Sequence, residues 1–174
     1  RKAEDLTFHQ IEDALLNFMR DEEGEVLIIH MMNDEEKSVI PFYKQPYSCA
    51  SSDANLNIGG NSHPRTYGAF PRVISRCVRD MNILSLEDAI RKMTSLPASI
   101  LQLNDRGLVK EGYKADLVIF NYKTIREMGT IENGNQFPEG IEHVIVNGEI
   151  TCKQGEHTGA LKGKILRHPL PNRT

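Results

Sequence analysis

Apolar and polar residues follow two different spacings in the first part of the chain. Over Thr7–Asp21 the apolar residues recur three or four positions apart, which predicts an amphipathic helix. Glu25–His30 is nearly all apolar and predicts a strand buried on both faces, as in a parallel sheet. Asn33 is a candidate N-cap for a short helix, which Pro41 and Pro46 interrupt. The small residues of Tyr47–Ser52 predict a second strand. This order of elements is typical of an α/β fold.

The middle of the chain is predicted to be a loop followed by helices. Asn55–Tyr67 is rich in Asn, Gly and Ser, and loops of this length are usually functional or mobile. The helix that follows is predicted over Pro71–Met81. The next helix, over Ser85–Met93, opens with a serine and an aspartate in the pattern of a capping box. A further helix is predicted from Pro97, as its first residue, to about Leu103.

After Gly107 the pattern changes to short β strands. Strands are predicted over Ala115–Phe120 and Glu142–Val146. Asn147-Gly148 is typical of a tight hairpin turn and leads into a strand over Glu149–Cys152. The glycine-containing tail is predicted to form a turn and then an irregular end. The chain therefore has a β-rich part after its α/β part.

Composition and charge exclude several classes of function. With 21 basic and 24 acidic residues, the net charge of −3 gives no reason to expect nucleic acid or an anionic membrane as a partner. The apolar runs are too short to span a bilayer. Three widely spaced cysteines, Cys49, Cys77 and Cys152, fit a reducing compartment, so we expect a cytoplasmic protein. No signal-peptide pattern follows Arg1, and since Arg1 is not methionine we expect it to be a processing or proteolysis boundary.

Asp53 is the most suggestive acidic residue. It follows a predicted parallel strand and precedes the long loop. Ligands lie at this edge of α/β sheets and barrels, where a carboxylate can bind a metal or act as a general base. The alternative is an Asx turn in which Asp53 caps a backbone amide. Position alone leaves both interpretations open.

His63 and Arg65 flank Pro64, which restricts the local backbone. The planar guanidinium of Arg65 can hold a substrate carboxylate. The alternative is a structural salt bridge to the neighbouring helix. Three further arginines lie on roughly one face of that helix and are interpreted as a solvated or ion-paired face: Arg72, Arg76 and Arg79.

The histidines and cysteines do not define a metal site. His30 follows the first predicted strand, but a lone histidine beside two methionines is more typical of a packed residue. The six histidines include no H-x-H or H-x-x-x-H pair, whereas a zinc site needs three or four ligands. Cys49 is interpreted as a small buried thiol. We therefore assign no metal ligand in this chain, and the candidate residues form an incomplete active site.

Several motifs between about residues 48 and 168 belong together. They are Ser52-Asp53, His63-Pro-Arg-Thr-Tyr-Gly-Ala-Phe-Pro-Arg72, Lys92-Met-Thr-Ser-Leu-Pro-Ala98, Glu111-Gly-Tyr-Lys-Ala-Asp-Leu117, Pro138-Glu-Gly-Ile-Glu-His-Val144 and Gly155-Glu-His-Thr-Gly159. In this combination the chain resembles the C-terminal part of the N-acyl-D-amino-acid deacylases (D-aminoacylases), which are metal-dependent hydrolases of the amidohydrolase superfamily.

The resemblance implies an α/β architecture, the C-terminal portion of a (β/α)8 barrel plus the C-terminal share of a small β-sandwich domain. Residues 1–106 would hold the last strands and helices of the barrel, and residues 107–174 the share of the β domain. The family's metal-binding residues have no counterparts here, so we expect them upstream of Arg1. Zinc is then the cofactor of the complete enzyme, and we expect this chain alone neither to bind zinc nor to be active.

The resemblance also implies roles for individual residues. Asp53 matches the family's catalytic aspartate, which activates the zinc-bound water and passes its proton to the leaving amine. Arg65 matches the arginine expected to hold the substrate's α-carboxylate, and His63 is assigned with it to substrate binding. Ala54 stands where the family usually has glycine.

The resemblance thus predicts part of a zinc-dependent hydrolase that converts N-acyl-D-amino acids, its small-molecule partners, into a carboxylate and a D-amino acid. One alternative is a short degenerate relative that acts as a non-enzymatic binding or oligomerisation module and self-associates through exposed sheet edges. Another is a sister amidohydrolase that acts on a different amide, such as a cyclic one. The His-Pro-Arg motif favours the deacylase branch by resemblance.

Overall fold

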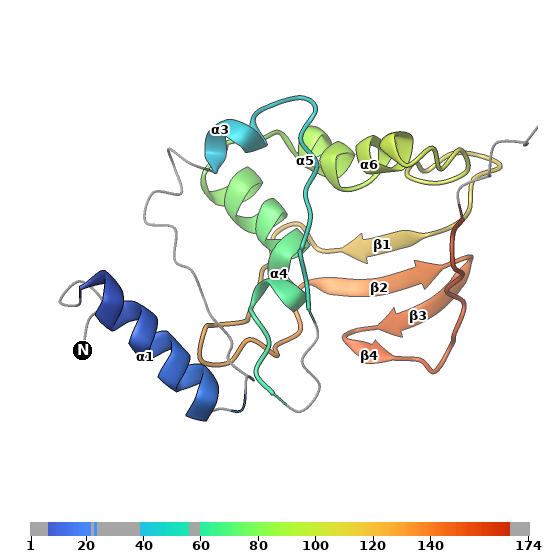
Figure 1. Cartoon of the computed structure of the whole chain (residues 1–174). Coiled ribbons are helices and arrows are strands. Elements are labelled where there is room, and N and C mark those ends of the chain that lie inside the picture. Colours follow the sequence, from blue (N-terminus) through green and yellow to red (C-terminus); the bar gives the residue numbers. More distant parts are fainter. Residues whose placement is uncertain (1–6, 22, 24–38, 56–59, 168–174) are drawn as a thin grey trace, which may run out of the picture. The chain divides into compact units, whose positions relative to one another are not determined.

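The computed structural model describes residues 7–21, 23, 39–55 and 60–167 (Figure 1). Contacts divide the chain into two compact units, Arg1–Asn33 and Asp34–Thr174. In the first unit the predicted amphipathic helix is confirmed as α1 (Phe8–Asp21), with Arg20 in its last turn, where a positive charge is favourable. The predicted strand over 25–30, with His30, and the helix start at Asn33 lie outside the described residues.

The second unit begins with short helical segments that pack on one another. The α5·α6, α4·η2 and α5·η2 pairs are in contact, and the part of the chain that follows them forms a β sheet. In the described ranges, no helix is long and apolar enough to cross a membrane. The helical segments are α3 (Ile40–Tyr43), α4 (Arg65–Arg72), the π-helical segment η2 (Val73–Asp80), α5 (Leu86–Met93) and α6 (Ser95–Ile100).

The helix predicted over Pro71–Met81 begins earlier than its first proline suggested. It starts at Arg65, directly after Pro64, whose φ of −50° is already helical. Pro71 lies inside α4 rather than in its first turn. Because proline lacks a backbone N–H and clashes with the carbonyl four residues earlier, it disturbs the regular α-helical ladder. The change to π-helical bonding follows at Val73.

The serine cap predicted for the next helix is confirmed, whereas the start predicted for the last helix is wrong. The Ser85 side chain caps α5 by accepting a hydrogen bond from the Asp88 N–H (3.1 Å). α6 begins at Ser95, so Pro97 is the third helical residue instead of the first. Proline is tolerated there because the first-turn N–H groups have no intrahelical acceptor. The helix ends before Gln102, whose φ of 56° lies in the left-handed region.

The hydrophobic core of this unit lies between η2 and α5. It consists of Val73, Val78, Leu84 and Ala89, against which Ala50 and other partly buried residues pack. The segment Tyr47–Ser52, predicted to be a strand, is irregular. Its prediction is wrong because a strand requires a neighbouring strand for its ladder, whereas Ala50 donates its N–H to the carbonyl of Lys92 in α5 (3.1 Å).

Lys92 is a buried lysine that ties this irregular segment to α5. Its side chain is 1% exposed, and its Nζ donates to the Ser48 carbonyl (3.3 Å), the Ser48 Oγ (3.2 Å) and the Gln45 carbonyl. The Asp88 carboxylate lies 3.8 Å from the same nitrogen. Buried charges are retained where polar groups surround them. Lys92 therefore holds the stretch of chain that leads to Asp53.

The β part is a four-stranded antiparallel sheet in the order β1-β2-β3-β4 (Figure 1). The Asn147-Gly148 turn between β2 and β3 is confirmed, with φ of 48° and 84° as a type I′ turn requires. Gln154-Gly155 repeats this geometry and leads into β4, so the predicted turn is confirmed, whereas a short strand follows it in place of an irregular end. The strands are β1 (Leu117–Phe120), β2 (Ile141–Val146), β3 (Glu149–Lys153) and β4 (Glu156–His157).

Two arginines join the helical part to the β part. Arg106, after α6, forms an ion pair with Asp116 before β1 and donates to the Asn147 side chain (3.1 Å). Arg79 in η2 donates to the carbonyl of Ile125 (2.8 Å), a residue that is itself buried. The Arg79 contact holds the connection between β1 and β2 against η2, which matters for the site described below.

Candidate functional site

Asp53 and Arg65, which sequence analysis selected separately, contact each other. The Arg65 Nη2 lies 2.8 Å from the Asp53 Oδ2. Asp53 has a φ of 45°, a left-handed conformation that few residues besides glycine adopt without cost. Ser51 Oγ accepts the Asp53 N–H at 3.4 Å, and Ser52 Oγ accepts the Ala54 N–H at 3.3 Å. The two serines thus support the strained backbone that presents the carboxylate to Arg65.

This ion pair is exposed and therefore weak. The Asp53 side chain is 84% exposed and the Arg65 side chain 45% exposed. Pairs of this kind contribute about 0–1 kcal/mol because solvent screens them and both side chains lose freedom. A carboxylate from a ligand can therefore replace Asp53 as the partner of Arg65 at little cost. The geometry is that of an exposed arginine paired with an exposed carboxylate.

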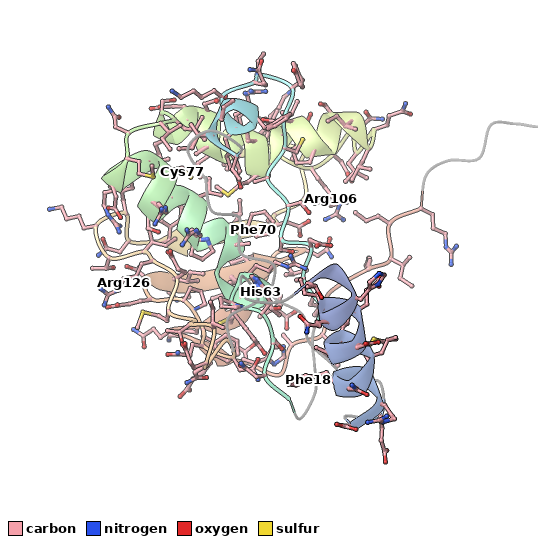
Figure 2. All side chains as sticks on the ribbon, turned by 60° about the vertical axis from the view of Figure 1, so that its left-hand side comes forward. Phe18, His63, Phe70, Cys77, Arg106 and Arg126 are labelled. Carbon is pink, nitrogen blue, oxygen red and sulfur yellow. The ribbon has the colours of Figure 1, made fainter. Side chains whose placement is uncertain are left out.

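His63 stands at the start of α4 and accepts a backbone hydrogen bond there (Figure 2). Its Nδ1 accepts from the Arg65 N–H at 3.1 Å, and its carbonyl accepts from the Thr66 N–H at 2.9 Å. Burial, with the adjacent Arg65 charge as the second cause, lowers the pKa of His63 below its ordinary value of 6.5. A neutral ring fits this bond, since Nδ1 must carry no proton to accept it. Nε2 is then the ring nitrogen that carries the proton.

We expect the stability of the chain to depend on His63 below neutral pH. The unfolded chain takes up this proton near pH 6.5, whereas the folded chain does so only at lower pH. The free energy of unfolding should therefore fall as the pH drops from about 6.5 towards the lowered pKa. His63→Asn, whose Oδ1 can still accept the Arg65 N–H, should make this fall shallower in urea unfolding followed across that range.

A matched control for this variant is His157→Asn. His157 also accepts a backbone N–H at Nδ1, from Gly159 at 2.9 Å, but its side chain is exposed on β4. We expect it to retain the wild-type slope of unfolding free energy against pH. Equal slopes for all three proteins would contradict a role for His63 in the acid sensitivity.

The arginines along α4 and η2 bind the connection between β1 and β2. Arg72 pairs with Glu127 at 2.9 Å, and Ser75 Oγ donates to the same carboxylate at 2.7 Å. Arg79 donates to main-chain carbonyls of this connection, including that of Tyr122 at 3.1 Å. For Arg72 the predicted ion-paired role is confirmed. Arg79 also binds main-chain carbonyls of the connection, which the spacing of the arginines along the sequence did not indicate.

Sequence analysis missed a set of reciprocal hydrogen bonds just before His63. Asn61 Nδ2 donates to the Ile131 carbonyl (2.8 Å), while Asn61 Oδ1 accepts the Gly134 N–H (2.8 Å). Asn135 Oδ1 accepts the Ser62 N–H (3.0 Å), while Asn135 Nδ2 donates to the Gly60 carbonyl (2.7 Å). We call this set the asparagine clasp. The Asn and Gly content of both segments was the available signal, but it is equally typical of ordinary loops.

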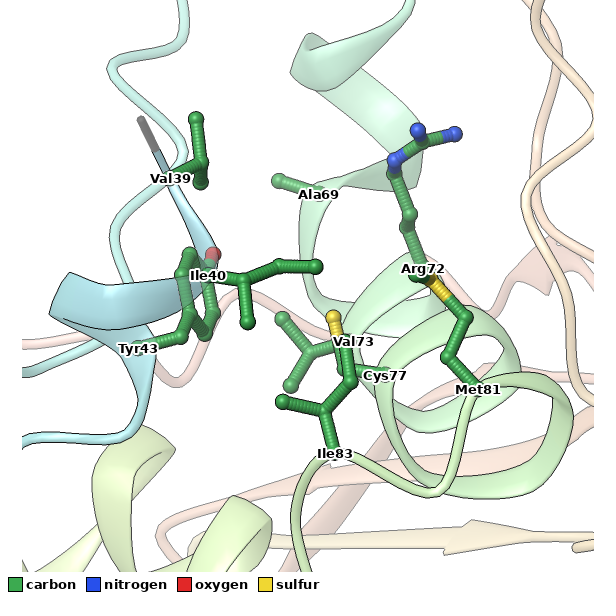
Figure 3. Close-up of a pocket in the computed structure, with 9 residues that line it drawn as sticks. All are labelled: Val39, Ile40, Tyr43, Ala69, Arg72, Val73, Cys77, Met81 and Ile83. Atoms are coloured by element: carbon green, nitrogen blue, oxygen red, sulfur yellow. The ribbon is translucent and has the colours of Figure 1, made fainter. Parts of the chain in front are cut away.

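An apolar pocket lies elsewhere in the same unit (Figure 3). It has a volume of about 170 Å³, and Ile40 and Tyr43 of α3 face Val73 and Cys77 of η2 across it. Its lining includes neither Asp53 nor Arg65. Because few polar groups converge in it, the pocket lacks the features of a reaction site.

Within the described ranges, no three His, Cys, Asp or Glu residues come close enough to hold a metal ion. Zinc sites in enzymes use three protein ligands and leave a position open for water or substrate. The described residues therefore do not by themselves fit a zinc site. What they offer is a carboxylate, a guanidinium and a neutral imidazole around the start of α4.

Comparison with known proteins identifies relatives of this chain. The chain is 38% identical over 133 residues to N-acyl-D-aspartate deacylase of Alcaligenes xylosoxydans xylosoxydans. This match covers 76% of this chain and 26% of the relative. A solved D-aminoacylase described with a binuclear metal centre matches with a TM-score of 0.73 and 35% identity, over 76% of this chain and 28% of that one. An N-acyl-D-glutamate deacylase from Bordetella bronchiseptica, solved with zinc and a phosphonate inhibitor, matches with a TM-score of 0.65 and 33% identity, over 70% and 25%.

These relatives are hydrolases, and the structural match supports the predicted class of (β/α)8-barrel hydrolase, of which this chain carries a part. Residues 44–152 also match the sequence pattern of the amidohydrolase family. The chain belongs to the amidohydrolase family, and the predicted resemblance is confirmed. It spans about a quarter of the length of the relatives that it matches.

Proposed function

We propose that the chain is part of a zinc-dependent amidohydrolase that hydrolyses N-acyl-D-amino acids to a carboxylate and a D-amino acid. The observation that carries the proposal is the Asp53–Arg65 contact of 2.8 Å in a chain similar to named N-acyl-D-amino-acid deacylases. An N-acyl-D-amino acid has a free α-carboxylate next to the amide that is cleaved. An exchangeable arginine beside a carboxylate suits both features of this substrate.

Arg65 would bind the substrate by exchanging its ion partner. The substrate carboxylate takes the place of the Asp53 carboxylate, because the existing pair is exposed and weak. The planar guanidinium can hold the new carboxylate by two parallel hydrogen bonds, which orients the amide. The same exchange releases Asp53 for proton transfer. Substrate binding and the availability of the catalytic carboxylate are therefore coupled.

Asp53 would act as the general base and then as the general acid. Hydrolysis of the amide adds the oxygen of water to the acyl carbon and protons to the departing nitrogen. Asp53 takes a proton from the attacking water and gives it to that nitrogen as the C–N bond breaks. Zinc in such enzymes lowers the pKa of bound water and polarises the carbonyl. We place the zinc of the complete protein on residues other than the described ones.

The proposed architecture divides the chain into two parts. We assign residues 1–106 to the last strands and helices of the barrel and residues 107–174 to the C-terminal share of a small β sandwich. On the edge strand β1, the neighbouring residues Val118 and Ile119 point to opposite faces and are 54% and 47% exposed. An edge strand that is apolar on both faces is usually covered, which favours a further layer contributed by the longer protein.

The same exposed strand also favours the alternative hypothesis of a non-enzymatic protein. In this hypothesis a short relative self-associates through its sheet edge and acts as a binding or oligomerisation module. Apolar surface on an edge strand can pair with a second copy of the chain. We propose a cytoplasmic location for either form, supported by the three widely spaced cysteines.

The proposal is tested on the native protein that carries this chain, isolated with an antibody against residues 107–167. We expect it to release D-methionine from N-acetyl-D-methionine, or the D-amino acid from the aspartate or glutamate analogue. The L-enantiomers should not react. A chelator should abolish the activity and zinc should restore it, while the isolated 174-residue chain should remain inactive.

Three results would contradict this proposal. Turnover of a cyclic amide but of none of the N-acyl-D-amino acids would favour a sister amidohydrolase. Inactive protein that migrates at the size of this chain would favour the binding module. Turnover of N-acetyl-D-methionine by the isolated chain at an enzyme-like rate would show that the chain holds a complete site.

A further inference from the structure

The connection between β1 and β2 lies directly against the segment that carries His63 and Arg65. Gly134 approaches Ser62 so closely that a Cβ on the glycine would lie 1.8 Å from the Ser62 carbonyl oxygen. A Cβ on Gly129 would lie 3.2 Å from the Pro64 Cα. Ser62 itself is 2% exposed. Only glycine permits this approach, so the two segments form one packed layer at the start of α4.

Further contacts continue this layer along α4. The rings of Tyr67 and Phe137 meet edge to face with their centroids 5.1 Å apart. Gly68 lies against Glu127, whose Cβ would be 2.7 Å from a Cβ on the glycine. Glu127 then pairs with Arg72 at 2.9 Å. The connection is therefore attached at both ends of α4, by the asparagine clasp at one end and by Glu127 at the other.

We propose that Asn61 and Asn135 are positioning residues that set the orientation of Arg65 for the substrate carboxylate. This inference rests on the proposed function and adds to it a contribution from the connection between β1 and β2. Each asparagine uses both its carbonyl and its amide group, so that the clasp comprises four hydrogen bonds between two segments more than sixty residues apart.

The clasp can influence Arg65 through the backbone, because the contact that its guanidinium makes with Asp53 is exposed. Its side chain is 45% exposed, and its charged partner Asp53 is 84% exposed. The His63 Nδ1 bond to the Arg65 N–H holds the backbone at the start of α4, and so fixes the point from which the Arg65 side chain extends towards its ion partner. Pro64 restricts rotation between the clasp and Arg65. Displacement of residues 60–62 is consequently transmitted to the arginine.

The test uses Asn135→Ala in the full-length protein with two substrates. One is N-acetyl-D-methionine, and the other is its amide analogue, in which a carboxamide replaces the α-carboxylate. We expect the KM for the carboxylate substrate to rise by about tenfold, with kcat changed less than twofold, since a misplaced binding group weakens orientation. The kcat/KM for the amide analogue, which lacks the carboxylate, should stay within twofold. Amide hydrogen exchange of residues 60–68 should become faster.

Two further variants calibrate this result. Asn135→Asp keeps the acceptor for the Ser62 N–H but loses the donor to the Gly60 carbonyl, so its KM should lie between those of the wild type and Asn135→Ala. This variant also tests the clasp if the alanine variant fails to fold. Gln136→Ala removes a neighbouring side-chain amide that bonds within its own loop, to the Asn133 carbonyl at 2.9 Å, and should behave as wild type.

The outcomes distinguish failure of the positioning role from failure of the proposed function. Unchanged KM and unchanged exchange in Asn135→Ala and Asn135→Asp would overturn the positioning role while wild-type activity leaves the proposed function standing. An equal loss for both substrates would also overturn it, because the clasp would then have a general structural role. A wild type without deacylase activity would overturn the proposed function and with it the assignment to a substrate carboxylate. Hydrogen exchange would then decide whether the clasp holds the segment.

Discussion

Asp53→Asn in the full-length protein is expected to lower kcat for N-acyl-D-amino acids by about 10²- to 10⁴-fold, the usual contribution of a general acid–base group. An asparagine keeps the size and a hydrogen-bonding oxygen but cannot take up the proton. The KM should stay constant or fall, because Asp53 competes with the substrate carboxylate for Arg65. Steady-state kinetics with N-acetyl-D-methionine measures both effects.

Asp80→Asn is the matched control for this change. Asp80 is another exposed aspartate paired with an arginine, at 3.2 Å from Arg79, and it lies at the end of η2. We expect the control to retain kcat within a factor of about two. If Asp53→Asn retained kcat equally well, Asp53 would not be the proton-transfer group, and its pairing with Arg65 would be structural.

Arg65→Met is expected to lower kcat/KM for substrates with a free carboxylate by about 10- to 150-fold, mainly through KM. This range corresponds to about 1.5–3 kcal/mol for a hydrogen bond to a charged group. Arg65→Lys should recover only part of the loss, because an ammonium group lacks the planar fork that matches a carboxylate. For the amide analogue, Arg65→Met should change kcat/KM much less.

Arg126→Met controls for loss of an exposed, ion-paired guanidinium. Arg126 pairs with Glu139 at 2.6 Å and is 55% exposed, which is close to the exposure of Arg65. We expect its kinetics to equal those of the wild type. A loss in Arg65→Met that is equal for the carboxylate and amide substrates would exclude recognition of the carboxylate as the role of Arg65.

Local chemistry explains which elements sequence analysis found. The Ser85 cap and the Asn147-Gly148 turn are decided by groups within a few residues of one another, so their patterns predict structure directly. Pro64, Pro71 and Pro97 show the limit of local patterns. Proline suits several positions in the first turn of a helix and is occasionally held inside one, so it indicates that a helix is near without giving its first residue.

The candidate site was predicted as separate residues rather than as an arrangement. Asp53 and Arg65 carry recognisable chemistry and stand within matched motifs, so each was selected from the sequence alone. Their contact across the intervening loop was not predictable from the periodicity of either segment. Lys92 was matched within a motif, yet its burial against Gln45 and Ser48 appears only once α5 packs on the chain before Asp53.

By itself the sequence determined that helices lie in these regions, though not where α4 and α6 begin. It also determined the hairpin, the family and the residue types available for chemistry, because these depend on short-range spacing and on motifs. The tertiary structure decided that Tyr47–Ser52 is irregular, that Asp53 meets Arg65, and that Asn135 reaches Ser62. Each of these features depends on a hydrogen bond or ion pair between residues that are not neighbours in the sequence. Such partners are chosen by packing, since many polar side chains could satisfy the same group and only the fold brings one of them within reach.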